Sequence, residues 1–167
     1  MKARPNKPQH YKSGYYKPLN ESKIVGNSTD IVFRSSLEYK FCIYVDNSDK
    51  VIKWGSEVVK VPYISYDGKQ HNYIIDFYVE IKNPNNPTGY ERLLIEVKPH
   101  AESMRIINNE PPKKPTVITP KSLKNWEYSI KEFAKNKQKW IYAQEYARLK
   151  GMKFLVVTDK MINSSFL

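Results

Sequence analysis

The sequence has little cysteine and little histidine: one cysteine, Cys42, and three histidines among 167 residues. A single cysteine excludes an internal disulfide, and no cysteines and histidines are grouped with the spacing of a zinc site. The chain also lacks an apolar run long enough to span a membrane, and no apolar segment follows the basic N-terminus as it would in a signal peptide. These absences argue against a disulfide-rich secreted protein, a zinc module and a membrane protein. We expect a protein that is intracellular when it is made.

Acidic residues are few relative to basic ones. The 28 lysines and arginines exceed the 17 aspartates and glutamates, which gives a net charge of +11. This excess favours a polyanionic partner, bound through phosphate contacts that depend on salt but not on base sequence. A charge that only keeps the protein soluble, or a ribosome-like charge, is the alternative. With 40% hydrophobic residues, the chain is long enough for one domain with a core.

The first 28 residues lack hydrophobic periodicity, and their lysines alternate with Tyr11, Tyr15 and Tyr16. We predict that residues 1–28 form a basic N-terminal arm, either flexible or docked on a partner. Its tyrosines could stack on bases or pack into a neighbouring protein. Residues 29–167 are predicted to form a single domain.

A helical pattern follows this arm. The predicted helix begins at Thr29 or Asp30, either of which could cap it, and runs to about Val45. It would bring Arg34 and Glu38 together, because residues four apart are neighbours on a helix surface. An exposed ion pair is the simplest interpretation of these two residues, and a carboxylate aimed at a site is the other.

The remaining segments are assigned from their apolar spacing and their turn residues. Strands are expected at about 51–54, 58–66, 73–79 and 91–98, and together they would form a largely antiparallel meander. A proline-rich loop at about 100–120 carries Lys113 and Lys114, and it is either a basic flap over DNA or a disordered insertion. A short helix and a longer one should then run from 120 to Gly151, before a buried strand at 152–158 that suits a parallel neighbour. This order predicts an α/β (α+β) fold.

The hairpin formed by the segments 73–79 and 91–98 carries three charged residues within apolar runs. If the chain folds back at Asn86, facing residues have numbers that sum to 172, which places Asp76 opposite Glu96. Side chains alternate between the faces of a strand, so Lys98 should share the face of Glu96. A solvent-exposed charged face is the simplest interpretation. The alternative is that the two carboxylates bind Mg²⁺ and that Lys98 orients or deprotonates a water, which is chemistry for breaking a phosphodiester bond.

The order of these residues resembles the PD-(D/E)xK nuclease superfamily, although Ile75 stands where that superfamily usually has proline. Two further patterns are similar to the N-terminal domain of TnsA-type endonucleases. They are Phe33-Arg34-Ser35-Ser36-Leu37-Glu38 and the later set Lys137-x-x-Trp140-x-x-Ala143, Gly151 and Phe154-x-Val156-x-Thr158. The short, basic chain also resembles the head-completion nucleases of T4-like bacteriophages.

The resemblance implies a restriction-endonuclease-like mixed sheet flanked by helices, and a Mg²⁺-dependent DNA endonuclease in which Mn²⁺ can substitute. The implied catalytic residues are Glu38, Asp76, Glu96 and Lys98. The metal ligands would be Asp76, Glu96, the Val97 carbonyl and Glu38. The implied partner is double-stranded DNA, and the residues implied in binding it are Arg34, Lys113, Lys114, Lys137 and Gln144.

The resemblance also implies a role after DNA packaging, when the DNA end is trimmed or sealed before the tail joins. The protein would then act in the host cytoplasm during assembly, remain with the virion, and meet portal or neck proteins. Two alternatives stay open: a non-catalytic, DNA-binding structural protein of the virion, and a resolvase or transposon-type endonuclease subunit.

Overall fold

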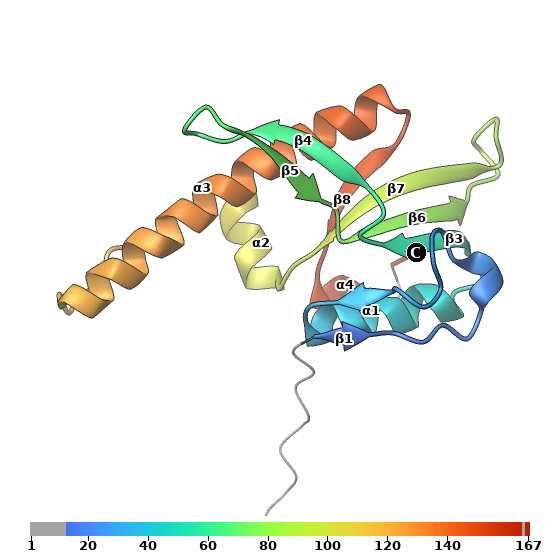
Figure 1. Ribbon diagram of the computed structural model, residues 1–167, viewed down its shortest axis with the longest axis horizontal. Coiled ribbons are helices and arrows are strands. Elements are labelled where there is room, and N and C mark those ends of the chain that lie inside the picture. The colour runs from blue at the N-terminus through green and yellow to red at the C-terminus, as the bar shows by residue number, and fades with distance from the viewer. Residues whose placement is uncertain (1–12, 165) are drawn as a thin grey trace, which may run out of the picture.

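The computed structural model describes residues 13–164 and 166–167 (Figure 1). Its central sheet has four strands in the order β3-β6-β7-β8. They are β3 (Val51–Ser56), β6 (Phe77–Lys82), β7 (Tyr90–Val97) and β8 (Lys153–Val157). The first three are antiparallel, and β8 is parallel to β7. The predicted mixed sheet is thus confirmed, including its parallel last strand, but β8 is less buried than predicted, because it is an edge strand in which only Val157 is buried.

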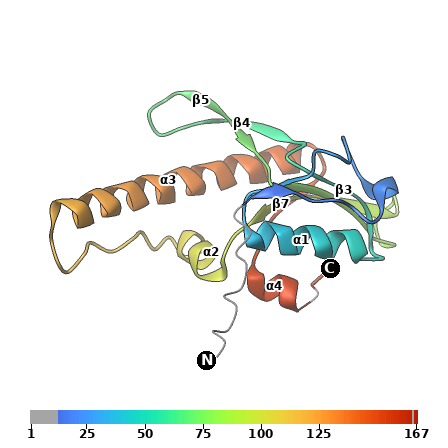
Figure 2. The ribbon, with the colours of Figure 1, turned by 60° about the horizontal axis from the view of Figure 1, so that its bottom comes forward.

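Helices cover both faces of this sheet. Helix α1 (Ser36–Asn47) packs on one face, where Phe41, Trp54 and Phe77 are fully buried, and the short α4 (Asp159–Asn163) lies beside it. Helix α3 (Pro120–Leu149) lies on the other face and buries Trp140 against Leu94 and its neighbours. Figure 2 shows the sheet between α1 and α3. The α/β layering follows from β-strands with two apolar faces, since each face needs a helix to exclude water.

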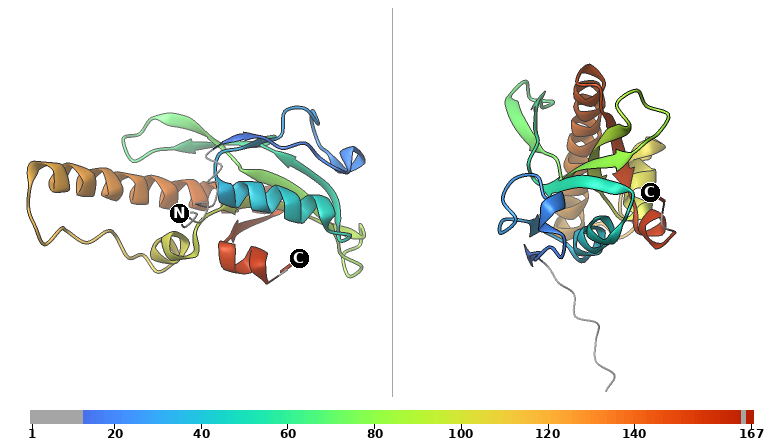
Figure 3. Two further views of the ribbon diagram at one scale, coloured as in Figure 1. Left: turned by 90° about the horizontal axis from the view of Figure 1, so that it is seen from below. Right: turned by 90° about the vertical axis from the view of Figure 1, so that its right-hand side faces the viewer.

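Helix α3 is longer than the sheet that it covers. Its N-terminal half projects past the sheet, and the segment that follows α2 (His100–Ile107) runs outward beside it to the start of α3 (Figure 3). The sequence predicted a loop over all of 100–120, so α2 is a correction: Ser103 and Ile106, three residues apart, are buried and hold this helix in place. The predicted pair of helices after residue 120 is one continuous helix, because nothing interrupts it before Gly151, which has the expected positive φ of 66°.

The predicted four-stranded meander is wrong. Strands β4 (Lys60–Ile64) and β5 (Gln70–Ile74) form their own two-stranded sheet, which packs on α3 and leaves β3 to pair with β6. The strand expected at 73–79 is therefore broken at Ile75 and Asp76. Tyr73 and Ile75 are buried on the α3 side, whereas Phe77 is buried on the α1 side, so the chain changes face between them.

The N-terminal residues that the structure describes, 13–28, are docked on the domain itself. Strand β1 (Gly14–Tyr15) pairs with β2 (Val32–Phe33), and the turn η1 (Glu21–Lys23) follows. The buried carboxylate of Asp46 holds the segment, accepting hydrogen bonds from the Tyr16 hydroxyl at 2.9 Å and the Leu19 N–H at 2.7 Å. Packed chain thus begins well before residue 29, while Tyr11 and the rest of the predicted arm lie outside the described residues.

Helix α1 begins six or seven residues later than predicted. Thr29 and Asp30 belong to a turn in which the Thr29 N–H and hydroxyl bond to Asn27. The N-cap is Ser35, whose hydroxyl accepts a hydrogen bond from the Glu38 N–H at 3.1 Å. None of the helices among the described residues is long and apolar enough to cross a membrane.

Candidate active site

Asp76 and Glu96 lie side by side where β6 begins and β7 ends. Phe77 pairs with Ile95, so the register of β6 and β7 sums to 172 as predicted, and Asp76 and Glu96 are the positions that follow this last pair, although Asp76 itself lies just outside β6. An Asp76 oxygen, Oδ2, accepts a hydrogen bond from the Val97 N–H at 2.8 Å, which fixes the carboxylate at the end of the two central strands. The change of chain direction before β6 frees Asp76 from strand pairing and leaves it facing Glu96.

This pair of carboxyl groups is electrostatically strained. Burial raises the pKa of Asp76 well above its usual range, and the adjacent charge of Glu96 raises it further. Burial also raises the pKa of Glu96, which is only 5% exposed, although the Tyr73 hydroxyl and Lys98 oppose that change. A divalent cation would relieve the repulsion, because two carboxylates are hard oxygen ligands. The donor set therefore fits a metal ion of the Mg²⁺ type.

Lys98 completes the cluster on the same face of the sheet, as expected. Its amine lies 3.7 Å from a Glu96 oxygen and 3.6 Å from a Glu102 oxygen. Burial disfavours its charged form, but the two carboxylates outweigh burial and raise the pKa of Lys98. Without a metal, Lys98 is thus a cation held beside the carboxylates, which suits it to stabilising negative charge and not to removing a proton.

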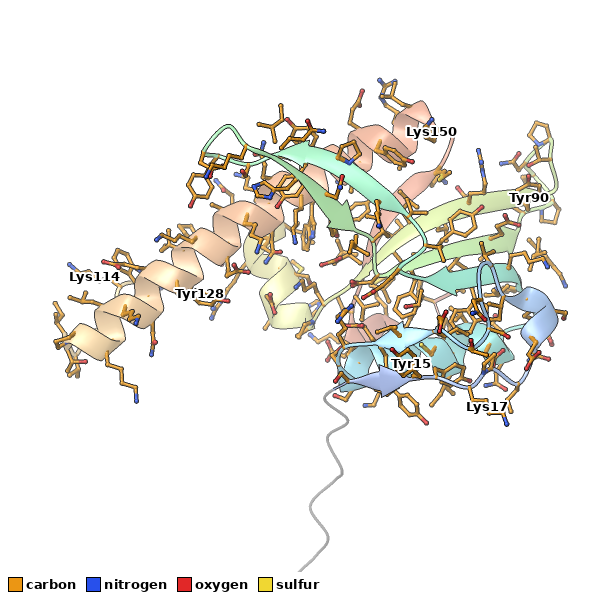
Figure 4. All side chains as sticks on the ribbon, viewed as in Figure 1. Tyr15, Lys17, Tyr90, Lys114, Tyr128 and Lys150 are labelled. Carbon is orange, nitrogen blue, oxygen red and sulfur yellow. The ribbon has the colours of Figure 1, made fainter. Side chains whose placement is uncertain are left out.

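The cluster opens into a cavity of ≈ 800 Å³ that is lined by residues at the ends of the two central strands and by residues of α2 and α3. Asp76, Glu96 and Lys98 form its floor, and Arg105 of α2 lines one wall. Tyr128, labelled in Figure 4, lies on the projecting part of α3 that lines the other wall. A phosphodiester and its flanking groups can therefore approach the carboxylates from solvent.

Tyr73 is a site residue that the sequence analysis did not identify. It is 3% exposed, and its hydroxyl donates to Glu96 Oε2 at 2.5 Å. Burial and the charge of Glu96 raise the pKa of Tyr73, so it stays a neutral donor. The only signal in the sequence was a tyrosine at an alternating apolar position, which is also typical of an ordinary core residue.

Tyr73→Phe should raise the Mg²⁺ concentration needed for half-maximal DNA cleavage, or lower activity, by about 10–100-fold, because partners that orient a ligating carboxylate carry effects of that size. Tyr78→Phe is the matched control, since the Tyr78 hydroxyl donates at 2.7 Å to Glu80, outside the cavity. An unchanged Mg²⁺ dependence in Tyr73→Phe would mean that this hydroxyl only packs.

Glu38 lies near the cluster but not in the cavity lining. Its carboxylate accepts hydrogen bonds from the Arg34 N–H at 2.7 Å and the Ser35 hydroxyl at 3.0 Å. Its charge still contributes to the raised pKa of Asp76. Among residues 13–164, 166 and 167, no three histidine, cysteine, aspartate or glutamate side chains form a ready metal site.

The residues predicted to bind DNA are placed in three regions. The Arg34 guanidinium pairs with both oxygens of Glu57, at 2.5 and 3.0 Å, and not with Glu38. Lys113 and Lys114 lie on the segment beside α3, with the Lys114 amine 6.0 Å from the centre of the Trp126 ring. On α3, Lys137 donates to Asn109 Oδ1 at 2.6 Å and Gln144 is exposed; neither lines the cavity.

Two comparisons relate the chain to known proteins. Residues 48–159 match the family model described as TnsA-like endonuclease N terminal. The chain is also 32% identical over 148 residues to the "Head completion nuclease" of Enterobacteria phage T4, a match that covers 88% of this chain and 91% of that protein. Asp76, Glu96 and Lys98 lie inside the segment that matches the family model, and Glu38 precedes it.

Proposed function

The chain belongs to the TnsA-like endonuclease family, and from this premise we propose that it cuts DNA at Asp76, Glu96 and Lys98 with the help of Mg²⁺. The observation that carries the proposal is the close pairing of half-buried Asp76 with buried Glu96, two carboxyl groups whose pKa values are both raised and that both line the cavity. Such a pair is costly to a protein that does not use it.

The roles of the residues follow from their contacts. Asp76 and Glu96 would hold the ion, with the Val97 carbonyl as a third ligand, and Tyr73 keeps Glu96 oriented. When bound, Mg²⁺ supplies a Lewis acid that neutralises the phosphate and stabilises the developing charge. Mn²⁺ should substitute, because it accepts the same oxygen ligands. Lys98 positions the attacking water and adds positive charge where the phosphate becomes more negative.

Glu38 has a supporting role in this proposal. Its carboxylate is held by the first turn of α1, and its charge already influences Asp76. A carboxylate close enough to influence Asp76 electrostatically can orient the attacking water or attract a second cation. Arg34, Lys113, Lys114, Lys137 and Gln144 would guide the DNA from outside the cavity.

The biological setting is proposed from the similar phage protein, which is named for head completion. The chain would process the packaged DNA end in the host cytoplasm during assembly, and then stay with the virion beside portal or neck proteins. Filled heads isolated before tail joining should therefore contain the protein. Its absence from heads at every stage of assembly would contradict this setting.

Metal dependence tests the proposed reaction directly. Purified protein should nick and then linearise supercoiled plasmid in Mg²⁺, should do so in Mn²⁺, and should stop when a chelator is added. A protein that shifts DNA in a gel but leaves it intact with Mg²⁺ and with Mn²⁺ would instead be the non-catalytic DNA-binding protein of the virion.

A further inference from the structure

The α3 wall of the cavity presents two polar side chains that the proposed reaction does not use. Asn136 and Lys139 are three residues apart on the helix and line the cavity together. Residues at that spacing lie on one helical face, one above the other. The same wall contains Ser129, Glu132 and Phe133.

Asn136 is buried without a hydrogen-bond partner. It is 9% exposed, and its side-chain amide bonds to none of the residues that the structure describes. Among the described residues, the fully buried side-chain atoms without a partner are the Nε1 atoms of Trp54 and Trp140, so the amide of Asn136 is not sealed off from the cavity that it lines. An amide that faces a cavity in this state is ready to bond to something that enters the cavity.

Lys139 is a cation without a counter-ion. Its amine lies 5.0 Å from the centre of the Tyr73 ring, and within the described chain no carboxylate oxygen comes within 4.0 Å of it. Burial is the main reason that the pKa of Lys139 is lowered. By contrast, Lys135 on the same helix pairs with Glu132 at 3.3 Å. The cavity lining thus contains one cation tied to carboxylates, Lys98, and two cations without an ion pair among the described residues, Arg105 on α2 and Lys139 on α3.

We propose that Asn136 and Lys139 bind a backbone phosphate of the DNA strand that is cut at Asp76 and Glu96. The lysine supplies the charge and the asparagine amide donates a hydrogen bond, which are the two kinds of contact that hold phosphates without reading base sequence. This inference depends on the proposed function, because it takes the cleavage cavity to be the DNA site. It makes Lys139 the lysine of α3 that contacts the DNA inside the cavity, whereas Lys137 would guide the DNA from outside it.

Lys139→Gln should weaken binding of a fluorescently labelled DNA duplex in Ca²⁺ by about tenfold or more, and should reduce the slope of log affinity against log salt by about one. Asn136→Asp keeps the size of the side chain but places a negative charge at the phosphate, so we expect at least as large a loss. Lys131→Gln is the matched control, because this exposed lysine of α3 lies outside the cavity. It should change the affinity less than twofold, since a surface charge contributes little.

The outcomes separate this inference from the proposed function. If wild type cuts DNA while Lys139→Gln binds and cuts like Lys131→Gln, the inference is overturned and the proposed function stands. If wild type does not cut, the proposed function fails, and binding in Ca²⁺ still decides whether these residues contact phosphate. Thermal unfolding of each variant shows whether a loss of binding comes from misfolding. If Asn136→Asp misfolds, Lys139→Gln decides the question, because the Lys139 side chain is only half-buried.

Discussion

Lys98→Met should lower the single-turnover rate of DNA cleavage by about 10²–10³-fold, the effect of removing one preorganised group that stabilises transition-state charge. The amine lies 3.7 Å from Glu96 and is held as a cation by carboxylates on two sides, so it needs no rearrangement to face the reacting phosphate. Methionine keeps most of the length and the apolar stem of lysine and removes only the charge. The rate should be measured with enzyme in excess over plasmid and at saturating Mg²⁺.

The control for Lys98→Met is Lys60→Met, since Lys60 is exposed on β4 and outside the cavity. That variant should cut at the wild-type rate. Stabilisation by Mg²⁺ should persist in Lys98→Met, because Asp76 and Glu96 remain and one repelling cation has been removed. A Lys98→Met protein that cuts as fast as wild type would remove this residue from the mechanism.

The position of Asp76 beside Glu96 could be predicted from the sequence, because it depends on a turn and two strands that are close together along the chain. A turn centred on Asn86 between two apolar strands fixes the register, and the structure keeps that register from Phe77 to Lys82. The parallel last strand was predictable for a similar reason, since a continuous apolar run after a helix is typical of a strand buried on both faces.

The separation of the β4–β5 hairpin from the central sheet could not be predicted in the same way. Tyr73, Ile75 and Phe77 alternate as they would in one straight strand, yet the first two face α3 and the third faces α1. Alternation with a period of two indicates that one face of a strand is buried, but it does not indicate which hydrophobic cluster covers that face. The contacts made by Tyr73 at the cavity also join residues that are far apart in the sequence. Tyr73 reaches Glu96, and Lys139 reaches Tyr73, across 23 and 66 positions of the sequence.

Asp76→Asn should abolish DNA cleavage, by on the order of 10³-fold or more, because it removes a charged ligand whose metal contributes several kcal/mol to the transition state. The same change should make the metal-free protein more stable at neutral pH. The asparagine oxygen can still accept the hydrogen bond from the Val97 N–H, and it carries no charge to repel Glu96. Loss of activity with a gain of stability distinguishes a functional carboxylate from a structural one.

The pH dependence of stability explains why Asp76→Asn should stabilise the metal-free protein. The folded-state pKa of Asp76 is raised above the ordinary value of 3.8, so between those two values the folded chain holds more protons than the unfolded chain. Its stability therefore falls as the pH rises through that window and is greatest below the ordinary value. Asp76→Asn should flatten this decline, and each kcal/mol that it gains should raise Tm by about 2–4 °C.

Mg²⁺ at 100 times its Kd should stabilise wild type by about 2.7 kcal/mol and leave the variant nearly unchanged. Equal stabilisation of both proteins by Mg²⁺ in thermal unfolding would place the metal elsewhere.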